Sequence, residues 1–235
     1  MKLSLNNFLT PAILAGGLGS RLGKVTKTTP KPLLKVNGEY FITYILEKIS
    51  LAGFKEVYIS ICYLKESFEK LIGKKYKNIK IKYLYEEQAL GTGGAVKNIF
   101  LNSNVENLMV FNGDSYCDFD LKLLINEFKI KRRNIILLCK VKRSGRFGNV
   151  IFDNNNKIIN FLEKRKLSKG YINAGIYILN NTIMKIRKKK FSIEKEFFEK
   201  CNTHEIYAFL SDDSFIDIGT PKSLTASNDF FKKLL

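Results

Sequence analysis

The sequence contains no tryptophan, a single histidine and only four cysteines among its 235 residues. The cysteines lie far apart, without a C-x-x-C pair, and His204 is the one imidazole available to join them. A zinc site built from cysteine and histidine is therefore not expected. Cys62 and Cys139 lie within apolar, strand-like runs, and we expect both thiols to be small residues of the core.

Long hydrophobic stretches are also lacking. No apolar run approaches the roughly 18 residues that a transmembrane helix needs. Residues 1–8 do not contain the apolar segment that a secretory signal peptide carries. We therefore expect a protein of the cytoplasm that has no membrane partner.

Charge is abundant but one-sided, since 40 Lys and Arg residues outnumber 22 Asp and Glu residues and give a formal net charge of +18. Such an excess is typical of proteins that bind nucleic acid. The lysines are nevertheless scattered along the whole chain among many Asn and Ile residues, a composition that a low-GC genome produces by itself. Basic and aromatic residues are not interleaved on one element. We therefore expect no nucleic-acid partner and rank DNA or RNA binding last among the alternatives.

Apolar runs of strand length alternate with segments of helical period along the chain. Strands are predicted at 12–15, 57–61, 79–85, 108–111 and 135–141, then at 148–152, 158–162, 175–179 and 205–209; helices are predicted at 41–51, 65–72, 93–101 and 121–128, and from about 193 and 221. This order predicts an α/β fold with a mostly parallel sheet that binds ligands at the carboxyl ends of its strands. No Pro/Gly/Ser-rich linker interrupts the order, so we expect a single domain over 1–235.

The first predicted strand runs directly into a glycine-rich loop. Its three glycines allow positive φ angles and a close approach of backbone N–H groups to phosphate oxygens. The loop matches neither the P-loop nor the dinucleotide-binding pattern, so a turn without a ligand is the alternative. A nearby lysine restrained by Pro30 and Pro32 favours phosphate binding. The predicted nucleotide-binding residues of this segment are Leu14, Ala15, Gly16, Gly17, Gly19, Ser20 and Arg21, with Lys31 beside them.

The glycine-rich loop, Thr26 and the run from Pro30 to Leu34 together resemble the signature of the sugar-1-phosphate nucleotidyltransferases. Gly23-Lys24 departs from a frequent proline-containing step, and Glu39-Tyr40 stands where the family often has Lys-Pro. The resemblance extends over residues 12–221 and implies a Rossmann-like, three-layer αβα fold with a mixed, mostly parallel sheet. It also implies a Mg²⁺ cofactor, a nucleotide-binding part near 1–115 and a sugar-phosphate-binding part near 116–235.

A second segment resembles the part of the family that contacts the nucleotide. It contains Glu86 and Glu87, followed by Gly91 and Thr92 at the predicted start of a helix. A carboxylate at this place accepts hydrogen bonds from both N1–H and the 2-amino group of guanine, whereas uracil offers one such donor. Guanine is therefore the favoured base. Which glutamate faces the base stays open, and an exposed acidic pair is the alternative.

Two aspartates match family positions that hold Mg²⁺. Asp114 follows Asn112 and Gly113 at the end of a predicted strand, and Asn112 and Gly113 match nucleotide-binding positions. Asp217 lies between apolar residues shortly before the last predicted helix. Carboxylate oxygens suit Mg²⁺, with phosphate oxygens and water completing the shell. As alternatives, Asp114 merely ends a strand and Asp217 caps the helix.

The resemblance also implies an acceptor site in the second half of the chain. Glu163 would bind sugar hydroxyls and Lys164 the sugar phosphate, although Arg165 replaces a common proline. Gly148, Asn173 and Gly175 would line the sugar pocket. Lys164 joins Arg21 and Lys31 as the expected catalytic residues.

The resemblance implies an enzyme that joins a nucleotidyl group to a sugar 1-phosphate and releases pyrophosphate, for surface glycan biosynthesis. Among short members, the run from Leu90 to Ala95 most resembles the D-glycero-D-manno-heptose 1-phosphate guanylyltransferases. Mannose-1-phosphate guanylyltransferase and hexose or amino-sugar uridylyltransferase stay open, as does a non-catalytic nucleotide-sugar sensor. The expected partners are a nucleoside triphosphate and a sugar 1-phosphate, and a homo-oligomer is compatible with the sequence.

Overall fold

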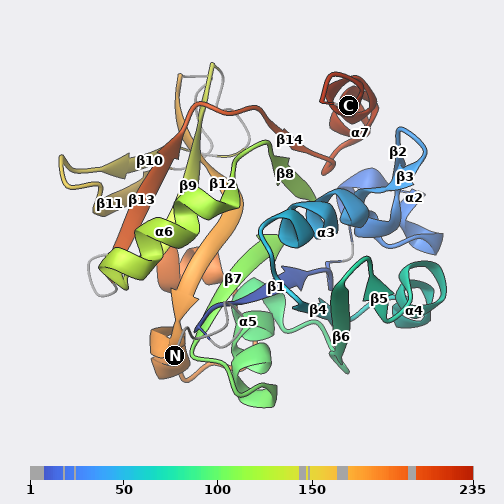
Figure 1. Cartoon of the computed structure of the whole chain (residues 1–235), viewed down its shortest axis with the longest axis horizontal. Coiled ribbons are helices and arrows are strands. Elements are labelled where there is room, and N and C mark those ends of the chain that lie inside the picture. The colour runs from blue at the N-terminus through green and yellow to red at the C-terminus, as the bar shows by residue number, and fades with distance from the viewer. Residues whose placement is uncertain are drawn as a thin grey trace.

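A computed structural model describes residues 8–17, 19–23, 25–142, 147, 149–162, 169–200 and 205–234. Its centre is an eight-stranded sheet with the order β13-β9-β12-β7-β1-β4-β6-β5 (Figure 1). These strands are β1 (Thr10–Leu14), β4 (Glu56–Ile61), β5 (Lys75–Tyr76), β6 (Ile79–Tyr85), β7 (Asn107–Asn112), β9 (Asn134–Val141), β12 (Gly170–Asn180) and β13 (Ile206–Ser211). Strands β5 and β12 are antiparallel to their neighbours and the other pairings are parallel, which confirms a mixed, mostly parallel sheet.

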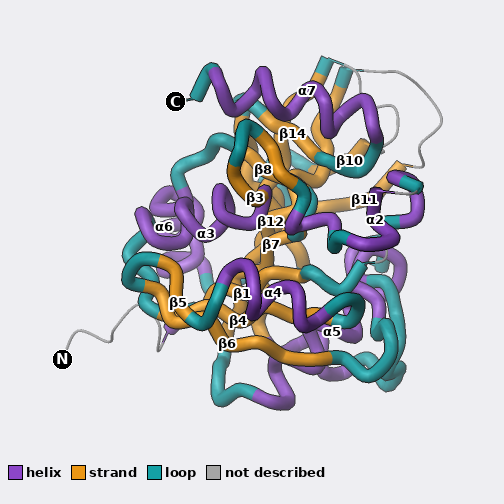
Figure 2. The backbone as a smooth tube through the Cα atoms, turned by 90° about the vertical axis from the view of Figure 1, so that its right-hand side faces the viewer, coloured by secondary structure: helices purple, strands orange, loops and turns teal. Residues whose placement is uncertain are grey.

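Helices cover both faces of the sheet and make three layers. One face carries α3 (Phe41–Leu51), α4 (Lys65–Ile72), α6 (Leu121–Lys131) and α7 (Pro221–Lys232), and the other carries α5 (Gly91–Asn102) with the short helices η4 (Asn181–Lys185) and η5 (Glu194–Phe198). Figure 2 shows α5 across the sheet from α3 and α6. The alternation along β7 explains the two cores, since Met109 and Phe111 enter the first and Leu108 and Val110 the second. The predicted α/β fold is confirmed.

Three further pairs of short strands lie outside the main sheet. They are β2 (Lys35–Val36) with β3 (Glu39–Tyr40), β8 (Ser115–Cys117) with β14 (Phe215–Asp217), and β10 (Asn149–Phe152) with β11 (Ile158–Leu162). The sequence did not predict β2, β3, β5, β8 or β14, because two or three residues are too few to display a period of two. The pair β8–β14 matters most for function, because it joins the segment after β7 to the segment before α7.

The cysteines agree only in part with the sequence-based expectation. Cys139 is fully buried on β9, but Cys62 follows β4 and is half-buried beside the glycine-rich loop, so the expectation of a core position for Cys62 was wrong. Within the described ranges, no cluster of three or more His, Cys, Asp or Glu side chains has the arrangement of a metal site. No helix in the described part of the chain is long and apolar enough to cross a bilayer.

Candidate active site

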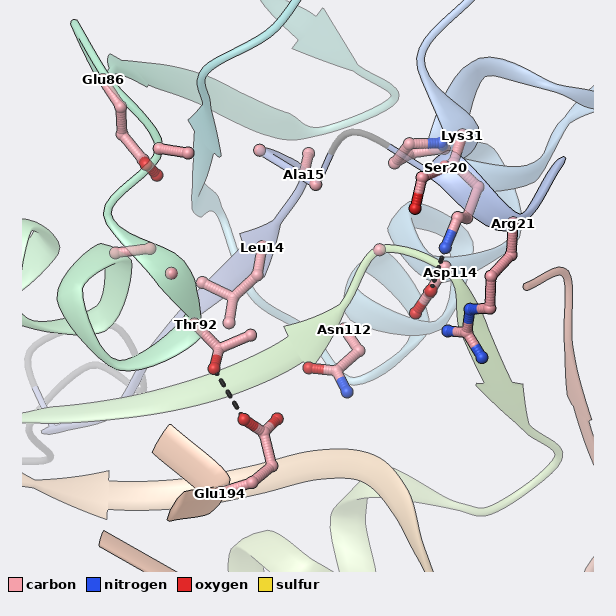
Figure 3. Close-up of a pocket in the computed structure, with 18 residues that line it drawn as sticks. Leu14, Ala15, Ser20, Arg21, Lys31, Glu86, Thr92, Asn112, Asp114 and Glu194 are labelled. Atoms are coloured by element: carbon pink, nitrogen blue, oxygen red, sulfur yellow. Dashed lines mark hydrogen bonds and ion pairs between the residues drawn. The ribbon is translucent and has the colours of Figure 1, made fainter. Parts of the chain in front are cut away.

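A cavity of about 520 Å³ opens where β1 and β7 end, between the glycine-rich loop and the start of α5. Its lining contains most of the nucleotide-binding and phosphate-binding residues expected from the sequence. They are Leu14, Ala15, Gly16, Gly17, Gly19, Ser20, Arg21, Lys31, Glu86, Gly91, Thr92, Asn112, Gly113 and Asp114. Figure 3 shows Arg21, Lys31 and Asp114 toward one end of this cavity and Glu86 toward the other. The fold thus brings four separate stretches of sequence to one site.

The glycine-rich loop is held in shape by its own neighbours. Gly19 adopts a left-handed conformation with φ of 65°, where glycine is favoured. The Thr26 hydroxyl donates a hydrogen bond of 3.0 Å to the Gly19 carbonyl oxygen. A Cβ atom on Gly19 would lie 2.8 Å from Thr26 Cγ2 and 3.4 Å from Lys31 Cε. Thr26 therefore holds the loop at Gly19, which lies beside the distal part of the Lys31 side chain.

Lys31 is not a mobile surface lysine. It begins the short helix η2 (Lys31–Leu33), which follows Pro30 and contains the buried Pro32. Only 11% of its side chain is exposed, and its Nζ lies 2.7 Å from Asp114 Oδ2. This packing holds an ammonium group beside the carboxylate at the end of β7. Arg21, an exposed residue of the helix η1 (Ser20–Leu22), adds a second cation to the same end of the cavity (Figure 3).

Of the two candidate glutamates, Glu86 lines the cavity, whereas Glu87 is exposed and outside the lining. Glu86 is 7% exposed, and its carboxylate is held at both oxygens. Ser60 Oγ donates to Oε1 at 2.7 Å, and the backbone N–H of Leu90 donates to Oε2 at 2.9 Å. A carboxylate oxygen has more than one acceptor position, so Glu86 can still accept hydrogen bonds from a ligand.

The pairing of β8 with β14 brings the two predicted metal ligands close together, since Asp114 directly precedes β8 and Asp217 is the last residue of β14. Asp217 lies opposite Ser115, and the N–H of Ile218 donates to the Asp114 carbonyl oxygen at 2.9 Å. The Asp217 carboxylate is buried and accepts hydrogen bonds from the Gly219 N–H at 2.6 Å and from Ser223 Oγ at 3.3 Å. Asp217 is not part of the cavity lining.

Asp217 is not itself the N-cap of α7, but it contacts a residue that helps to cap this helix. Thr220 is the N-cap of α7 and forms a capping box with Ser223, which in turn contacts Asp217. At Asp114, the side chain is 34% exposed and Oδ2 is paired with Lys31, while Oδ1 has no hydrogen-bond partner among the described residues. Two hard carboxylate donors, Asp217 at the end of β14 and Asp114 in the turn before β8 and open to the cavity, fit a divalent cation whose coordination substrate oxygens would complete.

The predicted sugar-binding residues that the structure describes lie behind the cavity wall. Asn173 and Asn112 both donate from Nδ2 to Tyr177 Oη, each at 3.0 Å. Gly175 has φ of 78°, and a Cβ atom there would lie 2.3 Å from Ser115 Oγ. Neither Asn173 nor Gly175 lines the cavity itself. The remaining three residues, Gly148, Glu163 and Lys164, lie outside the described residues.

Sequence reasoning missed one charged residue of the wall, Glu194. It lines the cavity opposite Thr92, whose Oγ1 donates to Glu194 Oε2 at 2.8 Å across 102 residues of chain (Figure 3). No local pattern indicates its role, because Glu194 lies in a short charged segment whose sequence is typical of an exposed helix. Ser60, which holds Glu86, was missed for the same reason, since its role arises only from tertiary contact.

Comparisons with known proteins show which family the chain belongs to. Residues 10–233 match the family described as nucleotidyl transferase. The chain is 37% identical to a D-glycero-alpha-D-manno-heptose 1-phosphate guanylyltransferase of Aneurinibacillus thermoaerophilus over 89% of this chain and 92% of that protein. It is 34% identical to the mannose-1-phosphate guanylyltransferase catalytic subunit beta of Drosophila melanogaster over 93% of this chain and 62% of that protein.

Solved structures give the same result. HddC from Yersinia pseudotuberculosis, crystallised with GMP-PN, superposes with a TM-score of 0.83 and 31% sequence identity. The match covers 95% of this chain and 99% of that one. Sequence match, fold and cavity therefore lead to one conclusion: the chain is an enzyme that belongs to the nucleotidyl transferase family.

Proposed function

We propose that the protein transfers a guanylyl group from GTP to D-glycero-α-D-manno-heptose 1-phosphate and releases pyrophosphate. The observation that carries the choice of base is the buried carboxylate of Glu86 at the cavity end away from Arg21 and Lys31. The choice of sugar is supported by the similarity to a heptose 1-phosphate guanylyltransferase that extends over nearly the full length of both proteins.

Glu86 is suited to guanine because its carboxylate is fixed before a ligand arrives. Ser60 and Leu90 hold its two oxygens, so little side-chain freedom is lost when a base binds. In the proposed complex, N1–H and the 2-amino group of guanine donate to this carboxylate, a charge-assisted pair of hydrogen bonds. Uracil has one donor to offer, and adenine presents an acceptor at N1. Glu87, which is exposed, has no part in this recognition.

The proposed reaction is an in-line displacement at the α-phosphorus of GTP. A phosphate oxygen of the sugar 1-phosphate forms the new P–O bond, and the bond between the α-phosphorus and the bridging oxygen breaks as pyrophosphate leaves. The attacking oxygen already carries negative charge, so no general base is needed. Arg21 and Lys31 neutralise the charge on the leaving pyrophosphate, and backbone N–H groups of the loop from Gly16 to Ser20 hold the remaining phosphate oxygens.

Asp114 and Asp217 are the residues that would hold Mg²⁺. When bound, the ion supplies charge neutralisation at the phosphates in a reaction that carries negative charge on both sides. Lys31 Nζ lies 2.7 Å from Asp114 Oδ2, and this ion pair keeps the carboxylate oriented toward the cavity. The same ammonium is close enough to the phosphate end to serve both the carboxylate and the substrate.

The acceptor is proposed to bind toward the second half of the chain. Lys164 takes the sugar phosphate, Glu163 takes hydroxyls, and Gly148, Asn173 and Gly175 shape the space around the sugar ring. Because β9, β12 and β13 belong to the same sheet as β1, we further propose that residues 1–235 act as one domain in the cytoplasm, with both substrates bound by a single chain. Mannose 1-phosphate is the second candidate acceptor, favoured by the similarity to the Drosophila enzyme.

The test is a pyrophosphate-release screen that crosses the four common ribonucleoside triphosphates with a panel of sugar 1-phosphates, with and without added magnesium. GTP with the heptose 1-phosphate should give the highest kcat/KM, and omission of magnesium should abolish turnover. A preference for UTP would contradict the role of Glu86. Silence for every pair with magnesium, together with tight nucleotide binding, would favour a nucleotide-sugar sensor instead.

A further inference from the structure

Glu194 places a carboxylate in the wall of the cavity that the proposed chemistry does not use. Its Oε2 accepts hydrogen bonds from Thr92 Oγ1 at 2.8 Å and from Ser192 Oγ at 2.5 Å. The N–H of Ile193 donates to Thr92 Oγ1 at 2.9 Å, so the Thr92 hydroxyl must point its hydrogen at Glu194. Within the described part of the chain, Glu194 Oε1 has no hydrogen-bond donor. One oxygen of the carboxylate is therefore saturated and the other is available to a ligand.

The segment that carries Glu194 is firmly docked against α5. The carbonyl oxygen of Phe191 accepts hydrogen bonds from the N–H groups of Gly93 and Gly94, and Phe197 and Phe198 are fully buried in the second core. A Cβ atom on Gly93 would lie 2.1 Å from Phe191 Cε2, so the contact requires glycine there. The carboxylate is thus preorganised, as a recognition group must be to discriminate between similar ligands.

A second acceptor lies in the same wall. Asn112 Oδ1 is buried without a hydrogen-bond partner, although the Asn112 amide nitrogen donates to Tyr177 Oη. The short helix that carries Glu194 packs against the Tyr177, Asn112 and Asn173 group, because the ring centroid of Phe198 in η5 lies 4.9 Å from that of Tyr177. Burial raises the pKa of Tyr177 above its ordinary value, and the Glu194 carboxylate raises this pKa further. An unpartnered buried acceptor costs free energy unless a ligand supplies a donor.

Charge decides which kind of ligand suits these two acceptors. A carboxylate repels phosphate groups, and Figure 3 shows Glu194 away from the cationic end formed by Arg21 and Lys31. It therefore requires neutral O–H or N–H donors. The base end is already served by Glu86, which leaves the hydroxyls of a sugar ring. Because η5, which carries Glu194, packs on Tyr177 of β12 through Phe198, the acceptor sugar fits this position better than the ribose of the nucleotide.

We infer that Glu194 is a specificity-determining residue that accepts hydrogen bonds from ring hydroxyls of the acceptor sugar, with Asn112 Oδ1 as its companion acceptor. The inference rests on the proposed function, because it needs a sugar 1-phosphate as second substrate. Thr92 is a positioning residue in this arrangement, since it directs the Glu194 carboxylate through the hydrogen bond to Oε2.

The experiment compares Glu194→Gln with Glu196→Gln, a matched control on the same short helix. Glu196 is paired with Lys188 and Lys200 and does not line the cavity. Initial rates are measured with GTP and the sugar 1-phosphate, and with analogues of the sugar that lack one ring hydroxyl at a time. Glu194→Gln should lower kcat/KM for the sugar 1-phosphate by about tenfold or more while KM for GTP changes by less than about threefold. In wild type, kcat/KM should be lower for one deoxy analogue than for the full sugar 1-phosphate. Glu194→Gln should remove this difference.

Two results would overturn this assignment. In the first, Glu194→Gln discriminates against every deoxy sugar by the same ratio of kcat/KM values as wild type. In the second, the variant lowers kcat/KM for GTP alone, and the difference from wild type disappears with 2′-deoxy-GTP or 3′-deoxy-GTP; this result would assign Glu194 to the ribose. Binding of the sugar 1-phosphate in the presence of a non-hydrolysable GTP analogue is measured by calorimetry as well. If wild type has no activity but binds the sugar 1-phosphate, and Glu194→Gln binds it more weakly, the proposed reaction is refuted and the inference about Glu194 is supported. Glu194→Asp, which retains the charge, covers the case in which the amide variant does not fold.

Discussion

At the phosphate end of the cavity, Gly19, Thr26 and Lys31 lie within one short stretch of chain, whereas in the opposite wall Thr92 contacts Glu194 across 102 residues. The phosphate end is held by its own hydrogen bonds and by prolines on either side of Lys31. The opposite wall exists only after η5 has docked on α5. Local chemistry therefore builds the part of the site that we propose for the triphosphate, and tertiary packing builds the part that we propose for the other substrate.

This difference assigns different consequences to substitutions in the two regions. A change at the phosphate end removes charge from the reacting groups, so it should lower turnover for every pair of substrates. A change at the base end or in the Glu194 wall should instead alter which substrates are accepted. The following variants are ordered from the largest expected effect to the smallest.

Asp114→Asn should have the largest effect. The substitution removes one of two carboxylates proposed to hold Mg²⁺ and replaces the charged group that lies 2.7 Å from the Lys31 ammonium by a neutral amide. Turnover should fall by about 10³-fold or more while the far-ultraviolet circular dichroism spectrum stays unchanged. The matched control is Asp118→Asn, at an exposed aspartate outside the cavity lining. A rate near that of wild type in Asp114→Asn would remove Asp114 from the site.

Lys31→Met should come next, because it removes one of two cations at the phosphate end and preserves much of the side-chain volume. We expect kcat to fall by about 10²-fold to 10³-fold, the scale on which removal of a single charge-stabilising group acts. Lys35→Met is the control, since Lys35 is exposed in the same segment and packs over the Tyr40 ring. Equal effects of the two variants in a pyrophosphate-release assay would mean that Lys31 acts through general charge and not through its position.

Glu86→Gln should change the choice of base more than the rate. The amide cannot accept from both guanine donors while keeping the contacts to Ser60 and Leu90. The ratio of kcat/KM for GTP to that for UTP should fall by about tenfold to a hundredfold, which the nucleotide arm of the rate assay measures. Glu87→Gln, at the exposed neighbour, should leave this ratio unchanged. A larger effect of Glu87→Gln would reverse the assignment.

Gly19→Ala should have the smallest effect, and mainly on stability. A Cβ atom there meets Thr26 Cγ2 at 2.8 Å, and alanine is strained at a φ of 65°. The free energy of unfolding in a urea titration should fall by about 1–3 kcal/mol. Gly17→Ala is the control for the fold, because a Cβ atom on Gly17 has nothing within 4 Å and φ at that position is not positive. Equal stability of the two variants would show that the loop tolerates a side chain at Gly19.

The contrast between the two regions also explains what the sequence could predict. Apart from β5, the strands of the main sheet follow from hydrophobic period, as do the helices α3, α4, α5, α6 and α7. The loop from Gly16 to Lys31 follows from residue types that are close in sequence. Glu86 could not be distinguished from Glu87, because the alternation along β6 breaks at its end, where Tyr85 is exposed and Glu86 is buried. Glu194 had no local pattern at all. The strands β8 and β14, whose pairing brings Asp114 and Asp217 close together, were too short to predict.

A matrix of kcat/KM values tests most directly whether the Glu86 end and the Glu194 wall select different substrates. The four ribonucleoside triphosphates are crossed with several sugar 1-phosphates for wild type, Glu86→Gln and Glu194→Gln. Glu86→Gln should change the ranking of nucleotides and leave the ranking of sugars, whereas Glu194→Gln should change the ranking of sugars and leave that of nucleotides. If both variants lower all values by the same factor, the Glu86 end and the Glu194 wall do not select their substrates separately, and the account is contradicted.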